Sequence, residues 1–439
     1  MGIDSLWPRI LKTEGDEFVV KKAPVETCFV DGQVMLMRSV VPDHVKTWRD
    51  FVEYNYMRKL RSLHGEFKRV ILAFDNYESV PVYKTIEQLK RSNLNQKTFD
   101  FQNGDKIPER PPCQDTWVLA LQNRTFKTVV ISVISRILAN CYKPPRRPAS
   151  LLIDWVNVVK IEYTHYKDTT ETIPTLSSMG EGDVKFQRFV GLYGDILVES
   201  VDSDVLLIAM LFIQKHEFNC NVYVKRIASR SLEDDEPAVK GEKRKRNARA
   251  PLQYEIVNVG AMLIMMQDCF RQAVGPEMVI SQQQVTVIMV CNMLMSGSDY
   301  SRKLPQLGPK FLWENMHVSA PLLMMAVGGS DEQVSICEQT FVDSVVTELY
   351  RAKYPKYIKV ETSNFDDAYA DIMQSKLSAK TKDSIPDKEF LICTSRNIQW
   401  IVRYWMLHNK NPQTSFDGSD GFVKIGQKLH FGTGSSGAD

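Results

Sequence analysis

Several features that assign a chain to a familiar class are missing from these 439 residues. The eight cysteines include no CxxC pair, and this spacing disfavours a zinc site. The formal net charge of +2 provides no global basic field, so any surface for nucleic acid has to be a local patch. A Gly-rich P-loop is absent, and no serine, cysteine or histidine forms a recognisable nucleophile–base motif. We therefore expect neither ATP binding nor a covalent enzyme intermediate.

Long apolar segments are also scarce. No uncharged apolar run approaches the roughly 20 residues that are needed to span a bilayer. Residues 1–12 carry acidic and basic side chains and no long apolar stretch typical of a signal peptide. Cys28, Cys141, Cys220 and Cys291 lie in or beside apolar runs, which is typical of buried thiols in a reducing compartment. We expect a soluble, intracellular protein without a membrane partner.

The first third of the chain alternates two patterns. Residues 27–30 and 68–74 are apolar, strand-like runs, and residues 48–63 between them have apolar side chains at helical spacing. The order strand, helix, strand indicates a parallel sheet. The sequence therefore predicts an α/β fold with a central, mainly parallel sheet flanked by helices.

The rest of the chain contains further helical patterns and one charged segment. Residues 116–142 predict a single apolar helix, and an apolar run at 151–159 follows. A helical block is expected from 256 to 327, followed by aromatic helices in the C-terminal region. Residues 228–250 have an acidic run and then a basic run with few apolar residues, which indicates a flexible insertion. Its KRKR run is either a nuclear-import signal or part of that loop.

Acidic residues follow the predicted strands. Asp31 and Asp75 each end an apolar run, and the carboxyl edge of a parallel sheet is where ligands bind. Residues two apart in an extended segment face the same side. The remaining acids form two such pairs and one residue in a glycine-containing turn, namely Glu181 and Asp183, Asp202 and Asp204, and Asp299.

So many carboxylates in one place would repel one another unless cations neutralised them. Mg²⁺ prefers oxygen ligands, so a set of Asp and Glu without His or Cys suits it. Two such ions about 4 Å apart can activate a water and stabilise a leaving oxygen in phosphoryl chemistry. A helix cap or a solvated turn is the better interpretation of any single acid, but the ordered set predicts a metal site.

The same blocks resemble the flap-endonuclease (XPG-like) superfamily of 5′ nucleases. The opening MGIDSL is similar to the family's MGI-x-x-L, and FVD at 29–31 and AFD at 73–75 are similar to its first two metal-binding aspartates. GEGD at 180–183 stands in the place of the family's SEAE-like element, and VDSD at 201–204 in that of its EDxD-like element.

SGSDY at 296–300, followed by LGPK at 307–310, resembles the family's helix–two-turn–helix element. The resemblance implies a PIN-like core with a helical arch, this element and a C-terminal helical extension. It also implies two Mg²⁺ ions, with Mn²⁺ able to substitute, and K⁺ at the helix–two-turn–helix element. The implied metal ligands are Asp31, Asp75, Glu181, Asp183, Asp202, Asp204 and Asp299.

Family members place a lysine and an arginine two helical turns apart at the base of the arch, where they stabilise charge on the scissile phosphate. Lys84 and Arg91 have this spacing, with Lys90 as a rival, and a solvated helix face is an equally good interpretation. The resemblance further implies four nucleic-acid-binding residues, which are Gly2, Lys303, Gly308 and Lys310.

The expected domain organisation follows these blocks. It comprises an XPG N-terminal-like region at 1–100, an arch or insertion at 101–150, an XPG internal-like region at 151–227, a flexible charged insertion at 228–255, a helix–two-turn–helix region at 256–327, and a C-terminal extension at 328–439 whose tail from Gly432 is expected to be disordered.

The chain also departs from the family pattern. Asp183 replaces the more usual Glu, and Gln306 stands where the family often has the first glycine of its turn. The stretch between Asp75 and Glu181 is longer than in a compact flap endonuclease, so the arch is expected to be enlarged or replaced. Residues 427–431 are only faintly similar to a sliding-clamp-binding motif, so no clamp partner is predicted. These departures indicate a divergent member of the family.

Three functions remain open from the sequence. The first is a Mg²⁺-dependent, structure-specific 5′ nuclease acting on branched or flap DNA in replication, repair or recombination, in the nucleus or at a viral replication site. Trp7, Phe99 and Phe101 could stack on bases there, although core packing is the better interpretation. The second is a 5′→3′ exoribonuclease of the Xrn type, since GEGD and DSD also resemble elements of that family. The third is a non-catalytic nucleic-acid-binding scaffold.

Overall fold

A computed structural model describes residues 18–76, 99–177, 182–200, 202, 204–227, 254–275, 280–298, 303–329, 334–359, 361–406, 422–425 and 428–431. Its centre is a nine-stranded sheet with the order β1-β9-β8-β7-β2-β3-β4-β5-β6. The strands are β1 (Val19–Val20), β2 (Thr27–Asp31), β3 (Arg69–Ala73), β4 (Ala149–Asp154), β5 (Asn157–Tyr163), β6 (Asp168–Ser177), β7 (Ile196–Glu199), β8 (Val222–Ile227) and β9 (Tyr254–Asn258).

The middle of this sheet is parallel. Strands β8, β7, β2, β3 and β4 run in one direction, while β5, β6, β9 and β1 add antiparallel edges. All five residues of β2 are buried, as expected for a parallel strand covered on both faces. The prediction of an α/β fold with a central, mainly parallel sheet flanked by helices is confirmed.

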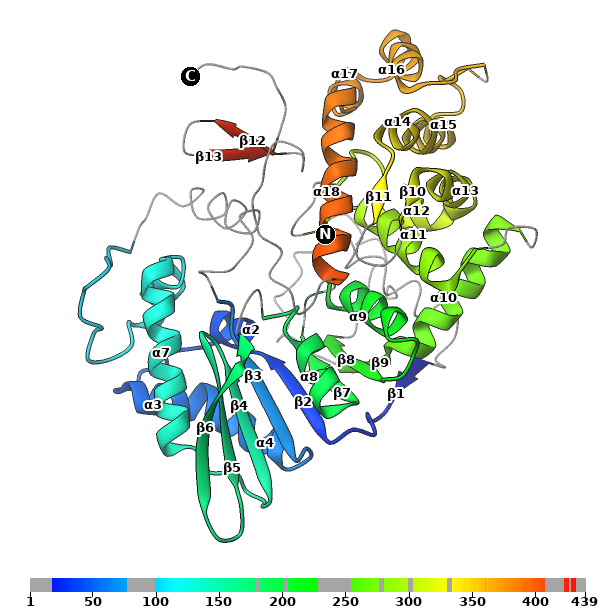
Figure 1. Ribbon diagram of the computed structural model, residues 1–439. Coiled ribbons are helices and arrows are strands. Elements are labelled where there is room, and N and C mark those ends of the chain that lie inside the picture. The colour runs from blue at the N-terminus through cyan, green and yellow to red at the C-terminus, as the bar shows by residue number, and fades with distance from the viewer. Residues whose placement is uncertain are drawn as a thin grey trace, which may run out of the picture.

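One face of the sheet is covered by helices from the first third of the chain (Figure 1). These are α2 (Gly32–Arg38), α3 (Trp48–Val52), the π-helical η3 (Glu53–Met57), α4 (Arg58–His64), α6 (Gln114–Ala120) and α7 (Arg124–Cys141). The helix expected at 48–63 is present as the continuous stretch α3, η3 and α4. It begins with a capping box in which Thr47 and Asp50 satisfy each other's backbone N–H groups.

One expectation for this part of the chain needs correction. The single helix expected at 116–142 is two helices, because the side chain of Asn123 accepts from the N–H of Phe126 and starts α7 anew. The apolar run at 151–159 forms the end of β4 and the start of β5, since the chain reverses between these two antiparallel strands. The segment expected as an arch or insertion contains α6 and α7, whose Trp117 and Phe126 are buried in the apolar cluster on this face of the sheet.

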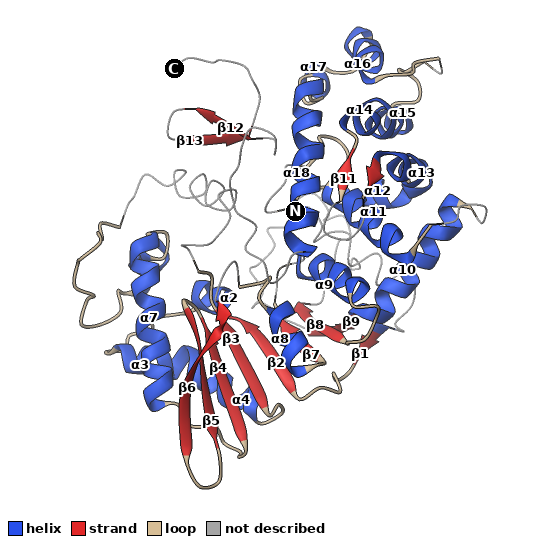
Figure 2. Cartoon of the chain, viewed as in Figure 1, coloured by secondary structure: helices blue, strands red, loops and turns tan. Residues whose placement is uncertain are grey.

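The opposite face carries α8 (Phe186–Tyr193) and α9 (Asp204–Lys215), which join a large helical region (Figure 2). That region contains α10 (Val259–Val274), α11 (Gln282–Leu294), α12 (Pro309–Glu314), α13 (Met316–Ala326), α14 (Glu338–Thr340), η6 (Phe341–Val346), α15 (Thr347–Lys353), α16 (Phe365–Gln374), α17 (Ala379–Lys382) and α18 (Lys388–Met406). Two short antiparallel pairs complete the described chain, formed by β10 (Val327–Gly328) with β11 (Ser335–Ile336) and by β12 (Phe422–Ile425) with β13 (Lys428–Phe431).

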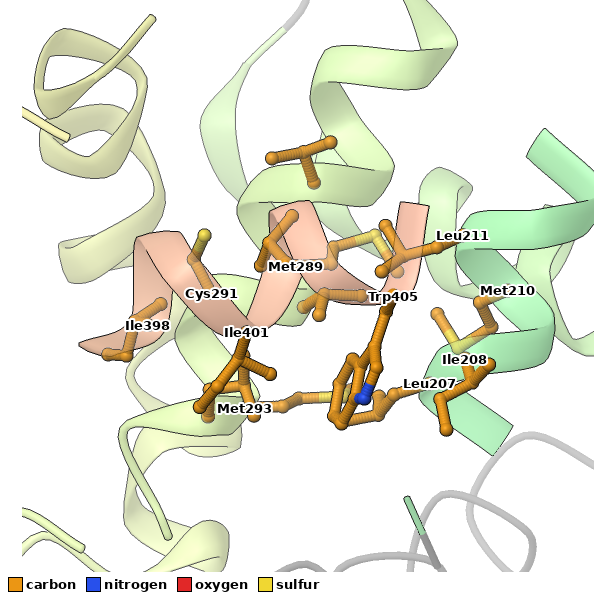
Figure 3. Close-up of a cluster of buried hydrophobic side chains, with 14 of the residues drawn as sticks. Leu207, Ile208, Met210, Leu211, Met289, Cys291, Met293, Ile398, Ile401 and Trp405 are labelled. Atoms are coloured by element: carbon orange, nitrogen blue, oxygen red, sulfur yellow. The ribbon is translucent and has the colours of Figure 1, made fainter. Parts of the chain in front are cut away.

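The C-terminal helix α18 belongs to the same core as the sheet. Trp405 lies among Leu207 and Ile208 of α9 and residues of α11 (Figure 3). The main chain at the end of α18 accepts two hydrogen bonds, from Gln187 Nε2 to Trp405 O at 3.2 Å and from Lys215 Nζ to Met406 O at 2.9 Å. The end of α18 is therefore fastened to α8 and α9, which themselves cover the sheet.

Three of the eight cysteines are buried, three are half-buried and two are exposed. All eight are free thiols; Cys28 and Cys291 are buried, and Cys141 and Cys220 are half-buried. Burial raises the pKa of Cys220 to about 11, so this thiol stays protonated at neutral pH. Among the described helices, none is both long and apolar enough to cross a membrane.

Candidate functional site

The carboxyl ends of the parallel strands meet at one edge of the sheet. From the central β2 the chain continues to β3 on one side, and it later adds β7 on the other. In such doubly wound sheets, ligands bind outside the carboxyl ends of the strands, where the strand order reverses. Here that place is the end of β2 and its two neighbours, which we call the carboxyl edge. The predicted acids Asp31, Asp75, Asp202 and Asp204 follow these three strands.

Asp31 is the last residue of β2 and is only 6% exposed. Its Oδ1 accepts from the backbone N–H groups of Gln33 and Val34 at 2.9 and 3.0 Å, and it thereby caps α2. This cap holds the carboxylate at the start of α2, where the helix dipole favours negative charge. Asp31 therefore does cap a helix, as the sequence suggested for any single acid, and the cap also orients its carboxylate.

Asp75 follows β3 and is 3% exposed. Its Oδ1 accepts a hydrogen bond of 2.8 Å from the backbone N–H of Gly182, a residue 107 positions later in the chain. A Cβ atom placed on Gly182 would lie 3.3 Å from Asp75 Oδ1 and 3.5 Å from Asp31 Oδ1. The two carboxylate oxygens thus converge on the position of one glycine.

The other described acids lie close by in the topology. Asp183 follows Gly182 and is 4% exposed. Asp204 begins α9 just after β7, is 3% exposed, and its backbone N–H donates to Asp202 Oδ1 at 3.0 Å. The backbone N–H of Asp202 donates in turn to Ser200 Oγ at 3.2 Å. The backbone N–H groups of Asp202 and Asp204 are therefore each bound to the side chain two residues earlier.

The structure brings together only part of the predicted metal site. Asp31 and Asp75 approach the same point, but within the described ranges no group of three or more His, Cys, Asp or Glu side chains could hold a metal ion. The donors that are present, carboxylate oxygens without His or Cys, have the chemistry that Mg²⁺ prefers. Six residues named from the sequence for the metal site, the scissile phosphate or nucleic-acid binding lie outside the described residues, namely Gly2, Lys84, Lys90, Arg91, Glu181 and Asp299.

A buried ionic cluster beside these acids was missed from the sequence. Lys185 and Asp154 are both completely buried, and Lys185 Nζ lies 3.0 Å from Asp154 Oδ1. Arg188 in α8 lies 3.2 Å from the other oxygen of Asp154. Burial lowers the pKa of Lys185, and the Asp154 carboxylate opposes that change. Asp154 ends the apolar strand β4, the same pattern that singled out Asp31 and Asp75, so the signal was available.

The segment compared with a helix–two-turn–helix element has its two helices in place. α11 is followed by a turn at Gly297, by a second turn at residues 304–307, and then by α12. Gln306 has a φ of 64°, the left-handed region that glycine adopts without cost, at the position where the family often has glycine. Lys303 and Lys310 are exposed, and Lys310 lies 3.5 Å from Glu314.

Residues of the C-terminal helical region form hydrogen bonds with this second turn, at residues 304–307. The hydroxyl of Tyr350 donates to the carbonyl of Pro305 at 2.9 Å, and Gln306 Nε2 donates to Ser384 Oγ at 2.8 Å. Both contacts fix the backbone that leads into Gly308 and α12. The turn is thus a supported part of the helical region.

The aromatic residues proposed to stack on bases have structural roles where they are described. The rings of Phe99 and Phe101 each meet that of Phe126, with centroids 5.0 and 5.2 Å apart. Asn123 also donates to both of their carbonyl groups. These contacts bind the segment to α7, as the core-packing interpretation requires, while Trp7 lies outside the described residues.

Comparison with known proteins adds no relative: no protein-family model and no curated protein matches this chain.

Proposed function

We propose that the chain is a divalent-metal-dependent nuclease with a PIN-like, flap-endonuclease-type core that hydrolyses phosphodiesters. The convergence of the Asp31 and Asp75 carboxylates on Gly182, at the carboxyl edge of a parallel sheet, carries the proposal. Buried carboxylates in this number are costly without a cation, and their oxygens are the ligands that Mg²⁺ prefers. The sequence resemblance to flap endonucleases supports the same chemistry.

The residues have separate roles in this proposal. Asp31, Asp75, Asp183, Asp202 and Asp204, together with Glu181 and Asp299, would hold two Mg²⁺ ions. When bound, the ions would supply Lewis acidity for an in-line attack of water on phosphorus. The backbone hydrogen bonds that Asp31 and Asp202 accept fix these side chains before any substrate arrives. Lys84 and Arg91 would stabilise charge on the scissile phosphate.

Branched or flap DNA is the substrate that we propose. Lys303 and Lys310 are exposed on either side of the supported turn before α12, where they could contact duplex phosphates without reading sequence. Phosphate contact by a short helix–turn element suits a nuclease that recognises the shape of a duplex end. Single-stranded RNA is the substrate of the alternative, Xrn-like interpretation.

The test is cleavage of 5′-labelled flap DNA, gapped duplex and single-stranded RNA, with Mg²⁺ or with EDTA. We expect Mg²⁺-dependent cutting near the flap junction, and a loss of at least about 100-fold in Asp75→Asn because a direct ligand is weakened. Asp195→Asn is the matched control, since Asp195 precedes β7 at the opposite edge and accepts from the backbone N–H of Asn221 at 2.8 Å. It should retain wild-type activity.

Three outcomes would change the proposal. Processive loss of RNA with no cleavage of DNA would favour the exoribonuclease. Binding of DNA with no cleavage under any metal would favour the non-catalytic scaffold. Equal activity of Asp75→Asn and wild type would show that Asp75 takes no part in the reaction, and the carboxyl edge would then not be the active site.

A further inference from the structure

The ammonium group of Lys185 touches three separate pieces of backbone and side chain at the carboxyl edge. Its Nζ donates to the carbonyl of Phe74 at 2.7 Å, to Asp154 Oδ1 at 3.0 Å and to the carbonyl of Trp155 at 3.3 Å. An ammonium has three N–H donors, so these three acceptors can use all of them. Because Lys185 is completely buried, the contacts are protected from competing water.

These contacts lead directly to a proposed metal ligand. Phe74 immediately precedes Asp75, and Asp75 accepts from Gly182, which lies in the same turn as Lys185. Two hydrogen bonds therefore join the 182–185 turn to residues 74 and 75: one reaches the backbone and the other the carboxylate. A third backbone bond, from Phe74 N to the carbonyl of Asp154 at 2.8 Å, closes the link to β4.

We propose that Lys185 is a positioning residue that sets the place of the Asp75 carboxylate, and so its convergence with Asp31, with Asp154 as the anchor of the lysine. This proposal rests on the proposed function, because the carboxylates are positioned for a metal ion. A group that orients a ligand typically contributes about 10- to 100-fold to metal affinity. Lys185 would act through Asp75 without touching metal or substrate.

A purely electrostatic influence of Lys185 predicts the opposite sign. A positive charge near the site repels a divalent cation, so removing it would tighten metal binding. If Lys185 instead positions the Asp75 carboxylate, its removal would weaken metal binding. The direction of the change therefore separates the two explanations, and it does not depend on catalytic activity.

The test is the affinity for Mn²⁺, measured by electron paramagnetic resonance of the free ion, in wild type, Lys185→Met and Arg188→Met. Both variants remove a cation from Asp154, and both should lower the unfolding temperature. Lys185 also donates to the Phe74 carbonyl. We expect affinity to fall about 10- to 100-fold in Lys185→Met and less than about threefold in Arg188→Met.

The outcomes separate this proposal from the proposed function. If the wild-type protein binds no Mn²⁺, the proposed function itself is contradicted. Wild-type binding with unchanged or tighter binding in Lys185→Met would overturn the positioning role and leave the nuclease standing. Equal weakening in both variants would show a general structural effect and also overturn it. If Lys185→Met does not fold, Lys185→Gln, which keeps two donors, must still weaken binding by about threefold or more.

Discussion

At the scale of single residues, Gly182 controls how close two acids come. It is buried and donates its backbone N–H to Asp75, and a Cβ atom at this position would lie 3.3 Å from Asp75 Oδ1 and 3.5 Å from Asp31 Oδ1. Its neighbours on the sheet side include the carbonyl of Ala73, at 3.4 Å from an added Cβ. Because that carbonyl belongs to strand β3, a side chain added at Gly182 would displace the neighbouring carboxylate side chains before it displaced the backbone.

We expect Gly182→Ala to displace the Asp75 carboxylate by a few tenths of an ångström from its position beside Asp31, because the added Cβ would lie 3.3 Å from Asp75 Oδ1. Mn²⁺ affinity should fall about tenfold, and stability should fall by about 1–3 kcal/mol from overpacking. Titration calorimetry and thermal unfolding measure the two effects. Gly191→Ala in α8 is the control, because no atom lies within 4 Å of its added Cβ. Unchanged Mn²⁺ affinity in Gly182→Ala would show that the two carboxylates do not share an ion.

At the scale of elements, the layers on the sheet are joined by buried polar contacts as well as apolar ones. His64 near the end of α4 is 2% exposed and connects three elements. Its Nδ1 lies 2.7 Å from the Tyr142 hydroxyl at the end of α7, and its Nε2 lies 3.1 Å from the carbonyl of Ser150 in β4. A carbonyl can only accept, so Nε2 carries the proton and Nδ1 accepts from the hydroxyl.

This contact predicts a pH dependence of stability. Burial lowers the pKa of His64 below its ordinary value of 6.5. Just below pH 6.5, His64 is therefore protonated in the unfolded chain and still neutral in the folded chain. The contribution of His64 is complete above pH 6.5 and is lost as the pH falls below that value, with a slope of at most about 1.4 kcal/mol per pH unit. Thermal unfolding of wild type and His64→Gln between pH 8 and 5 measures it.

The expected result is a lower unfolding temperature for His64→Gln at pH 8 and a smaller acid sensitivity than in wild type, so that the two converge at low pH. Tyr142→Phe is a useful companion, since it removes the hydroxyl but leaves the imidazole buried. If the difference between wild type and His64→Gln were constant with pH, the imidazole would not be the titrating group.

At the scale of the whole molecule, the sheet and the C-terminal helices share one core. Buried residues from β2, α8, α9, α11 and α18 form one contiguous apolar cluster, with Trp405 fully buried between α9 and α11 (Figure 3). A polar contact reinforces the centre of the helical part, where Gln267 Nε2 of α10 donates to Gln214 Oε1 of α9 at 2.7 Å. The carboxyl edge thus rests on helices that come from the end of the chain.

We expect Trp405→Ala to destabilise the molecule by about 3–5 kcal/mol, as large core truncations do. Because the core is continuous, the main unfolding transition should move as a whole. Differential scanning calorimetry measures this, with Tyr166→Ala as control, because that side chain is 99% exposed on the β5–β6 turn. A separate early transition that leaves the sheet intact would indicate that α18 is independent of the sheet.

Prediction from the sequence succeeded where one pattern had one structural meaning. The apolar runs that end in Asp31 and Asp75 became the adjacent parallel strands β2 and β3, paired from Thr27 with Arg69 to Asp31 with Ala73. It was less accurate where a pattern has several meanings. The run at 151–159 has apolar residues before Asp154 and after Asn157, so its apolar pattern alone does not show that the chain reverses at Trp155 and Val156.

The buried cluster shows the limit most clearly. Lys185 is a charged residue in a turn, for which the sequence favours exposure, and only the approach of β4 gives it Asp154 as a partner. Helices α6 and α7 show the same limit. The periodicity of the sequence predicts that each helix has an apolar face, but it does not predict which surface that face packs against.

The sequence by itself determined the elements that build the carboxyl edge and the acids that end its strands, since both depend on local runs and their spacing. Only the tertiary structure decided that Asp31 and Asp75 converge on a glycine 107 residues beyond Asp75, and that a buried lysine fastens the same turn to β3 and β4. The physical reason is that such contacts are formed when apolar faces pack together, and the choice of packing partner depends on the whole chain.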